Sequence, residues 1–340
     1  MSTPRVSVLM TMFNAAPHLR AAMQSILSQT YANFEFVIVD DASTDESAEI
    51  VERWRDPRIR LVRNSENKGQ TACLNQGLAL ARGEWIARQD ADDISLPQRL
   101  ERQLAFAERD NALALIGCQA WLANDRGAFA GLLNVPLGPE SILFSALFAN
   151  PFVHAAAMFR REVVNDLGNY DATFRICQDY DLWMRIARQH RSANLADRLV
   201  IYRVAENSLQ HRGREQTNAE SARVLRRVVA EAFPDETNVD EHVNALMSFR
   251  GEAGARSLQA IFATWRARYL AAHPSLAGNR DFRRTTALHL ATIARGEKGG
   301  PLAAISEMSR AFCADPQLLA KLGWERLCGP SMVRAYAAVP

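Results

Sequence analysis

The chain has 340 residues, of which 48% are hydrophobic and 23% charged, and this composition is that of a folded protein with a substantial core. It excludes a disordered chain, a collagen-like fibre and a small disulfide scaffold. The 40 basic and 38 acidic side chains give a net charge of +2, too balanced to indicate a nucleic-acid partner. Five cysteines without a C-x-x-C pair indicate reduced thiols rather than disulfides or a zinc site.

Strand-like and helix-like segments alternate over the first 120 residues. Short apolar β-type runs predict strands at residues 6–10, 36–39, 59–62, 85–87 and 112–118. Helical spacing, with Pro17 in a first turn and Ser43 or Thr44 as a cap, predicts helices at 17–27, 46–54, 71–81 and 97–109. This alternation is typical of a mostly parallel sheet with helices on both faces, whose ligands bind beyond the carboxyl ends of the strands.

The alternation weakens after about residue 131. The pattern predicts helices at 139–148 and 179–189 and strands at 156–159 and 195–202. From residue 214 only helical spacing remains, at 221–233, 257–272, 285–295 and 302–312. We therefore expect an α/β domain at 1–213 and an α-helical domain of unknown role at 214–340.

The sequence also bears on where the protein acts. Residues 1–5 lead directly into the first strand-like run, without the basic and apolar leader of an exported protein. The longest apolar tract, residues 142–153, is interrupted and shorter than the roughly 20 residues that span a bilayer. We expect a cytoplasmic protein whose only association with a membrane is peripheral, at its inner face.

Two acidic clusters follow predicted strands, Asp40-Asp41 after the second and Asp90-Ala91-Asp92-Asp93 after the fourth. Carboxylates at alternate positions after a strand can be aimed at one point. A divalent cation held there can bind a diphosphate through its remaining coordination positions and stabilise it as a leaving group. The alternative for either cluster is a cap on the next helix.

Two other interpretations concern the loops near Asp41. Adjacent aspartates also occur in phosphoreceiver domains, but there the pair follows the first strand rather than the second. Gly69, in Asn67-Lys68-Gly69, would let the backbone approach a phosphate, and a plain turn is an equally good interpretation. The sequence has no G-x-G-x-x-G and no Walker motif, which gives no support to dinucleotide or P-loop chemistry.

The segment Gln178-Asp179-Tyr180-Asp181-Leu182-Trp183 begins a predicted helix. Residues two apart on a helix point about 200° apart, so Asp179 and Asp181 cannot both face one site. Acidic residues in a first turn are also favoured by the helix dipole alone. His154 and His211 are isolated histidines, for which a structural role is the more common one.

Taken together and in this order, the motifs resemble those of the family 2 glycosyltransferases. They are Phe13-Asn14, Asp40-Asp41, Asn67-Lys68-Gly69, Gly83-Glu84, Asp90-Ala91-Asp92-Asp93 and Gln178-Asp179-Tyr180-Asp181. The resemblance covers about residues 5–212 and implies a GT-A fold, with a nucleotide-sugar half at about 1–120 and an acceptor half at about 121–213. Residues 214–340 match no family pattern.

The resemblance implies an inverting transfer from a nucleotide diphosphate sugar, a UDP-hexose or UDP-N-acetylhexosamine, to a hydroxyl of a saccharide or lipid-linked acceptor. Thr11 and Phe13 would flank the base, Asp41 would accept from its N–H, and Asp90 would contact the ribose. Asp92 would bind Mn²⁺ or Mg²⁺, and Asp179 would be the catalytic base. The remaining implied contacts are Asn14 and Lys68 on the nucleotide sugar and His154 and Gln178 on the acceptor.

Two positions depart from the family pattern, because Phe13 stands where tyrosine is common and Gln178 where glutamate commonly precedes the base. Two other functions would require different sequence features. A sugar-1-phosphate nucleotidyltransferase would carry a Gly-rich loop after the first strand, where this chain has no glycine. A non-catalytic sugar-nucleotide-binding module would not need Asp92 and Asp179. We expect a role in cell-surface polysaccharide or lipopolysaccharide synthesis, with the helical tail docked on the α/β domain or on a membrane.

Overall fold

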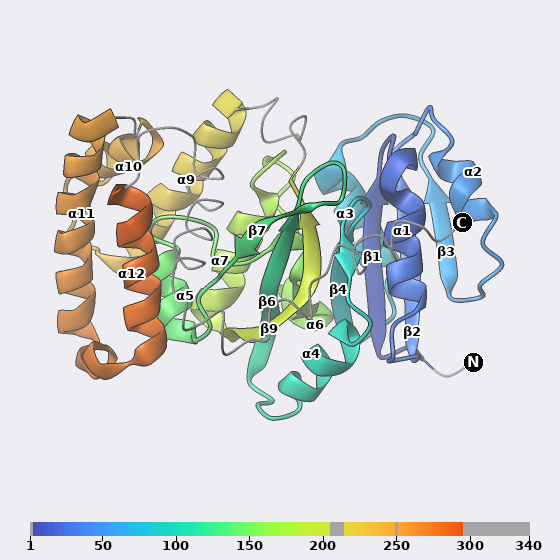
Figure 1. Ribbon diagram of the computed structural model, residues 1–340, viewed down its shortest axis with the longest axis horizontal. Coiled ribbons are helices and arrows are strands. Elements are labelled where there is room, and N and C mark those ends of the chain that lie inside the picture. Colours follow the sequence, from blue (N-terminus) through green and yellow to red (C-terminus); the bar gives the residue numbers. More distant parts are fainter. Residues whose placement is uncertain (1–2, 205–213, 249–250, 295–340) are drawn as a thin grey trace.

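Figure 1 shows the computed structural model, which describes residues 3–204, 214–248 and 251–294. Its strands are β1 (Val6–Met12), β2 (Phe34–Asp40), β3 (Ile59–Arg63), β4 (Trp85–Asp90), β5 (Ile94–Ser95), β6 (Leu113–Ala123), β7 (Phe129–Leu133), β8 (Met158–Arg160) and β9 (Arg191–Arg203). Its helices are α1 (Ala16–Leu27), α2 (Ser47–Glu52), α3 (Gln70–Leu80), α4 (Arg99–Ala107), α5 (Pro139–Ser145), α6 (Arg161–Asp166), α7 (Gln178–Gln189), α9 (Arg214–Ala232), α10 (Val239–Ser248), α11 (Gly251–Ala272) and α12 (Arg280–Ala294).

A mixed sheet runs through the described α/β part in the order β3-β2-β1-β4-β8-β6-β9-β5, with β7 paired to β6. Strands β1 to β4 are parallel to one another, as the alternating segments predict. The short β8 lies between β4 and β6 and is antiparallel to both, whereas β6 and β9 are parallel. The predicted α/β class with helices added at the C-terminal side is confirmed, and the antiparallel pairs all involve strands after β4.

The central strands β1 and β2 are mostly apolar because both faces of the sheet are covered. Every residue of β1 and β2 is buried. Val8 and Met10 of β1 belong to the same core cluster as Met23 of α1, whereas Leu9 belongs to the cluster that contains Leu74 of α3. Alternate side chains of a strand point to opposite faces, so helices pack on both sides of β1, as predicted.

Several local predictions were wrong or incomplete. Neither Ser43 nor Thr44 caps α2, whose N-cap position is Glu46 without a side-chain cap. Strands β5 and β7 and helices α6 and α10 were not predicted, and α10, the longest of them, has only 10 residues. The helix expected at 302–312 lies outside the described residues.

The C-terminal helices gather at one end of the molecule beside α5 and α7, and β1 to β3 lie toward the other end (Figure 1). Phe144 of α5 is in aromatic contact with Phe262 and Tyr269 of α11 and with Phe282 of α12. These rings belong to one core cluster with residues of the sheet. The expected docking on the α/β part is therefore seen for the described C-terminal helices, within residues 214–248 and 251–294. No described helix has the length and apolar character needed to cross a membrane.

Candidate active site

The loops after β1 and β2 meet at the carboxyl edge of the sheet. Phe13 follows β1 with half of its surface exposed, and such a ring can stack on a nucleotide base. Thr11, two residues earlier in β1, is buried. The Asn14 side-chain oxygen accepts from the Thr44 N–H at 2.8 Å, and the Asn14 N–H donates to Ser43 at 3.0 Å. Ser43 and Thr44, which were expected to cap a helix, thus join the loop after β2 to the loop after β1.

Asp41 directly follows β2 and is 4% exposed. Its Oδ1 accepts from the Lys68 N–H and its Oδ2 from the Gly69 N–H, both at 2.8 Å. Burial alone would raise the pKa of Asp41, but these and other hydrogen bonds outweigh it and hold the pKa below its usual value. The carboxylate is therefore an ionised acceptor. The Lys68 side chain is exposed, so its backbone is what contacts Asp41.

Gly69 adopts φ = 87°, a left-handed conformation that favours glycine. Its N–H is directed to Asp41 rather than to an approaching phosphate. Gly69 therefore acts as a support for Asp41, and the phosphate-loop interpretation of this glycine has no structural support.

A buried arginine organises the end of β4. Arg88 is fully buried and forms an ion pair with Asp90. Its Nε donates to Nε2 of His154 at 3.0 Å, and its Nη1 donates to the Leu9 carbonyl oxygen at 2.7 Å. Sequence reasoning missed Arg88 because one arginine forms no motif. The available signal was a charged residue inside a strand otherwise buried on both faces.

His154 is neutral in this environment. Burial, followed by the charge of Arg88, lowers the pKa of His154 to about 3. Its Nε2 accepts the Arg88 hydrogen bond, so Nδ1 carries the ring proton and lies 3.9 Å from Asp90 Oδ2. These contacts orient Arg88 and Asp90, and contact of His154 with an acceptor stays a prediction.

Replacing Arg88 by methionine is expected to destabilise the fold. Removing one partner of a fully buried ion pair costs about 3–5 kcal/mol, because the other charge stays behind uncompensated. The partial exposure of Asp90 reduces the expected loss to about 2–4 kcal/mol. Urea denaturation of the Arg88→Met variant measures it. A loss below about 1 kcal/mol would show that Asp90 does not depend on Arg88.

Asp92 and Asp93 follow Asp90 but have different surroundings. Asp93 is fully buried, and its Oδ1 accepts from the Arg203 N–H of β9 at 2.7 Å. Asp92 is only partly buried. Burial, followed by the charge of Asp90, raises the pKa of Asp92 to about 6. Asp90 and Asp92 are therefore the pair available to a ligand, whereas Asp93 fastens the loop to β9.

The pair fits a divalent cation. A 2+ charge would relieve the repulsion that raises the Asp92 pKa, and carboxylate oxygens are the donors that Mg²⁺ and Mn²⁺ take. Sites for phosphate ligands commonly hold such a metal by one or two carboxylates, with phosphate oxygens and waters completing the shell. The described residues contain no cluster of three or more His, Cys, Asp or Glu ligands.

Asp179 lies in the first turn of α7 and is partly exposed. Its Oδ2 accepts from the Asn150 side-chain amide at 2.8 Å, and its Oδ1 from the Tyr180 N–H at 2.7 Å. Burial raises the pKa of Asp179 to about 6, and the charge of Asp90 adds to the rise. The charge of Asp90 at the end of β4 therefore acts on the carboxylate of α7. Asn150, which no motif marks, orients Asp179.

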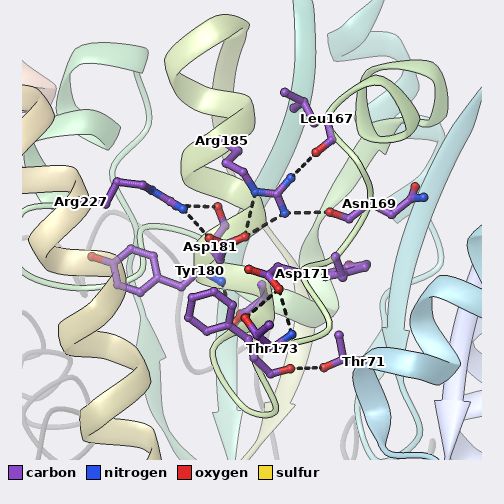
Figure 2. Close-up of polar contacts among 12 residues, drawn as sticks. Thr71, Leu167, Asn169, Asp171, Thr173, Tyr180, Asp181, Arg185 and Arg227 are labelled. Carbon is purple, nitrogen blue, oxygen red and sulfur yellow. Dashed lines mark hydrogen bonds and ion pairs between the residues drawn. The ribbon is translucent and has the colours of Figure 1, made fainter.

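Gln178 and Asp181 have different partners from Asp179. Gln178 is 1% exposed, and its Nε2 donates to Gln70 of α3 at 3.2 Å, so its contact with an acceptor stays a prediction. Asp181 is also 1% exposed and accepts from Arg185 at 2.8 Å and from Arg227 at 2.6 Å (Figure 2). The expectation that Asp179 and Asp181 face different surroundings is confirmed.

The comparisons with known proteins agree with this geometry. Residues 7–168 match the model of Glycosyl transferase family 2. The chain is 37% identical over 213 residues to the putative glycosyltransferase EpsE of Bacillus subtilis, an alignment that covers 61% of this chain and 75% of EpsE. The chain therefore belongs to glycosyl transferase family 2. Another relative, WfgD of Escherichia coli, is named as a UDP-Glc:alpha-D-GlcNAc-diphosphoundecaprenol beta-1,3-glucosyltransferase; it is 27% identical, with 60% of this chain and 79% of WfgD covered.

Solved structures share the fold. Residues 1–349 of Staphylococcus aureus TarS in complex with UDP superpose with a TM-score of 0.54 at 16% identity, covering 91% of each chain. The mannosyltransferase PcManGT of Pyrobaculum calidifontis, in complex with GDP-Man and Mn²⁺, gives a TM-score of 0.51 at 21% identity, covering 99% of this chain and 86% of that one. At these identities the likeness concerns the fold alone.

Proposed function

We propose that this glycosyltransferase moves a hexose or N-acetylhexosamine from its UDP-sugar to a hydroxyl of a saccharide or lipid-linked acceptor, with inversion. The observation that carries the proposal is the convergence of three groups at one edge of the sheet: Phe13 with Asp41, Asp90 with Asp92, and Asp179, whose pKa responds to Asp90. Phe13 and Asp41 suit binding of a nucleobase. Asp90 and Asp92 suit a metal-bound diphosphate, and Asp179 suits proton transfer.

The chemistry needs a single displacement. The acceptor hydroxyl attacks the anomeric carbon as the bond to the diphosphate breaks, and Asp179 takes the hydroxyl proton. Asn150 and the Tyr180 N–H fix the Asp179 carboxylate, and each of its oxygens retains a lone pair for that proton. Mn²⁺ or Mg²⁺, bound by Asp92 with Asp90 beside it, would supply charge neutralisation at the leaving diphosphate.

The nucleotide and the acceptor are inferred from complementary arguments. The ionised Asp41 carboxylate, with a lone pair left on Oδ2, suits the N–H of uracil. UDP in the TarS complex and UDP-Glc in the name of WfgD support the same nucleotide. The diphosphoundecaprenol acceptor of WfgD supports a lipid-linked acceptor in polysaccharide synthesis, and such an acceptor would bring the protein to the inner face of the membrane.

A binding screen tests the donor and the metal together. UDP-glucose, UDP-galactose, UDP-N-acetylglucosamine and GDP-mannose are added with Mn²⁺ or with a chelator, and thermal unfolding is followed. A ligand at 100 times its Kd stabilises the fold by about 2.7 kcal/mol. We expect stabilisation by a UDP-sugar with Mn²⁺ only. Stronger stabilisation by GDP-mannose would contradict the uracil assignment. Equal stabilisation with Mn²⁺ and with chelator would contradict the role of a metal in donor binding. Release of UDP then separates an enzyme from a binding module.

The turnover rate is expected to fall about tenfold per pH unit below pH 6 when Mn²⁺ and donor are saturating. Asp179 accepts a proton only when it is ionised. Burial, the largest cause of its pKa being raised from 3.8 to about 6, persists when Mn²⁺ neutralises Asp90, so protonation should inactivate Asp179 well above the usual range of a carboxylate. Saturating Mn²⁺ competes with the proton on Asp92 and keeps that group ionised. Rates between pH 5 and 8 are measured, with UDP affinity over the same range as the control. A constant rate down to pH 5 would contradict the assignment.

A further inference from the structure

The helix that carries Asp179 has no cap of its own. The N-cap residue Cys177 makes no side-chain capping bond. The N–H groups of Arg175, Ile176 and Cys177 instead donate to the carboxylate of Glu220, at 3.1, 2.9 and 2.9 Å. Glu220 belongs to α9, so a helix from the C-terminal part of the chain closes the turn directly before Asp179.

This contact is a charged one. Glu220 is 7% exposed and also accepts from the side-chain amide of Gln216 at 2.9 Å. Burial alone would raise the pKa of Glu220, but the three backbone hydrogen bonds outweigh it and hold the pKa below its usual value. An ionised carboxylate in a row of N–H groups makes strong, charge-assisted hydrogen bonds.

Arg227 makes a second contact with α7. It lies seven residues after Glu220, and residues seven apart on a helix point in nearly the same direction, so both contacts come from one face of α9. Arg227 binds Asp181 of α7, and Asp181 also binds Arg185 (Figure 2). Arg185 in turn donates to the carbonyl oxygens of Leu167 and Asn169, both at 2.7 Å. The loop before α7 and its first turn are therefore held from α9 at two points, with Asp179 between them in sequence.

We propose that α9 positions the catalytic base, with Glu220 and Arg227 as the positioning residues. They fix the first turn of α7, and thereby direct Asp179 toward Asn150 and the end of β4. The inference rests on the proposed role of Asp179. It assigns a function to the part of the chain after residue 213, which no motif explains.

Amide hydrogen exchange tests the mechanical part. In Glu220→Gln and Arg227→Met, exchange of the amides of residues 175–181 is expected to accelerate at least tenfold relative to β1, and Arg227→Lys should restore part of the protection. Arg226→Met is the matched control, because Arg226 of α9 pairs with the exposed Asp240 instead of α7. Unchanged exchange at 175–181, or equal acceleration throughout the protein, would overturn the proposal.

Turnover tests the functional part. With UDP-glucose, UDP-galactose and UDP-N-acetylglucosamine as a panel, Mn²⁺, and water as the acceptor, UDP release by Glu220→Gln is expected to fall about 10–100-fold at unchanged UDP affinity, because small misplacements of a catalytic group cost about that much. In the Asp179→Asn background the Glu220→Gln substitution should cost nothing further. A further loss there would reveal a merely structural role.

The two levels can fail separately. A normal rate for Asp179→Asn would contradict the proposed function. An inactive Asp179→Asn together with a normal rate for Glu220→Gln would contradict only the positioning role of α9. If wild-type protein releases no UDP with water as the acceptor, the binding screen with Mn²⁺ decides the donor assignment, and the exchange result decides whether α9 holds the turn.

Discussion

Replacing Asp179 by asparagine is expected to lower the turnover rate by about 10²–10⁴, the usual cost of losing a general base. The substitution keeps the shape of the side chain and its hydrogen bond to the Tyr180 N–H, but removes the group that takes the proton. Affinity for UDP with Mn²⁺ should not change, because Asp179 is assigned to the acceptor side of the sugar. Steady-state rates and calorimetric titration measure the two quantities.

Asp181→Asn is the matched control for that experiment. Asp181 is the same residue type two positions along α7, but it binds Arg185 and Arg227 and has no assigned contact with substrate. Hydrogen bonds to charged groups contribute about 1.5–3 kcal/mol each, so this variant should lose stability of that order. Because Asp181 also receives the Arg227 contact that positions Asp179, its turnover should fall as well, but by less than that of Asp179→Asn. A larger loss of turnover in Asp181→Asn than in Asp179→Asn would identify the wrong carboxylate as the base.

Asp92→Asn is expected to weaken UDP binding in the presence of Mn²⁺ by at least about 10–100-fold, the range found when even outer-shell partners of a metal are removed. The amide keeps the size of the side chain but loses the negative charge that attracts the cation. Titration of UDP with Mn²⁺ and with chelator measures the effect, which should disappear in chelator.

The neighbouring Asp93→Asn variant is the control. Burial raises the pKa of Asp93 well above its usual value, which favours the protonated form that asparagine resembles in shape and charge. It should therefore bind UDP almost normally. An equal loss in both variants would point to damage to the loop after β4, and no loss in Asp92→Asn would exclude its role at the metal.

The parts of the fold that could be predicted from the sequence depend on local patterns. Strands β1 to β4 each contain a short apolar segment, and the acidic motifs begin at Asp40 and Asp90, the last residues of β2 and β4, so their place at one sheet edge follows from the parallel order. The family and the α/β class were predicted from the same local patterns, and both predictions are confirmed. The separation of Asp179 from Asp181 needed only the geometry of a helix.

The rest depends on contacts between residues far apart in the chain. Arg88 meets His154, Asn150 meets Asp179, and Glu220 meets the turn before α7, and none of these pairs is adjacent or periodic in sequence. The predicted Ser43 and Thr44 caps are wrong because both hydroxyl groups instead form hydrogen bonds with Asn14 of the loop after β1. The roles assigned to site residues remain predictions.

The aromatic contact between α5 and the C-terminal helices covers side chains that a shortened protein would expose. Phe144 and Phe148 lie against Phe262, and Phe144 also lies against Phe282. A shortened protein that ends with the sheet would present these two rings to water, and a contiguous apolar patch of that kind promotes aggregation. A change in sequence texture near residue 213 is therefore a poor guide to where this protein can be cut.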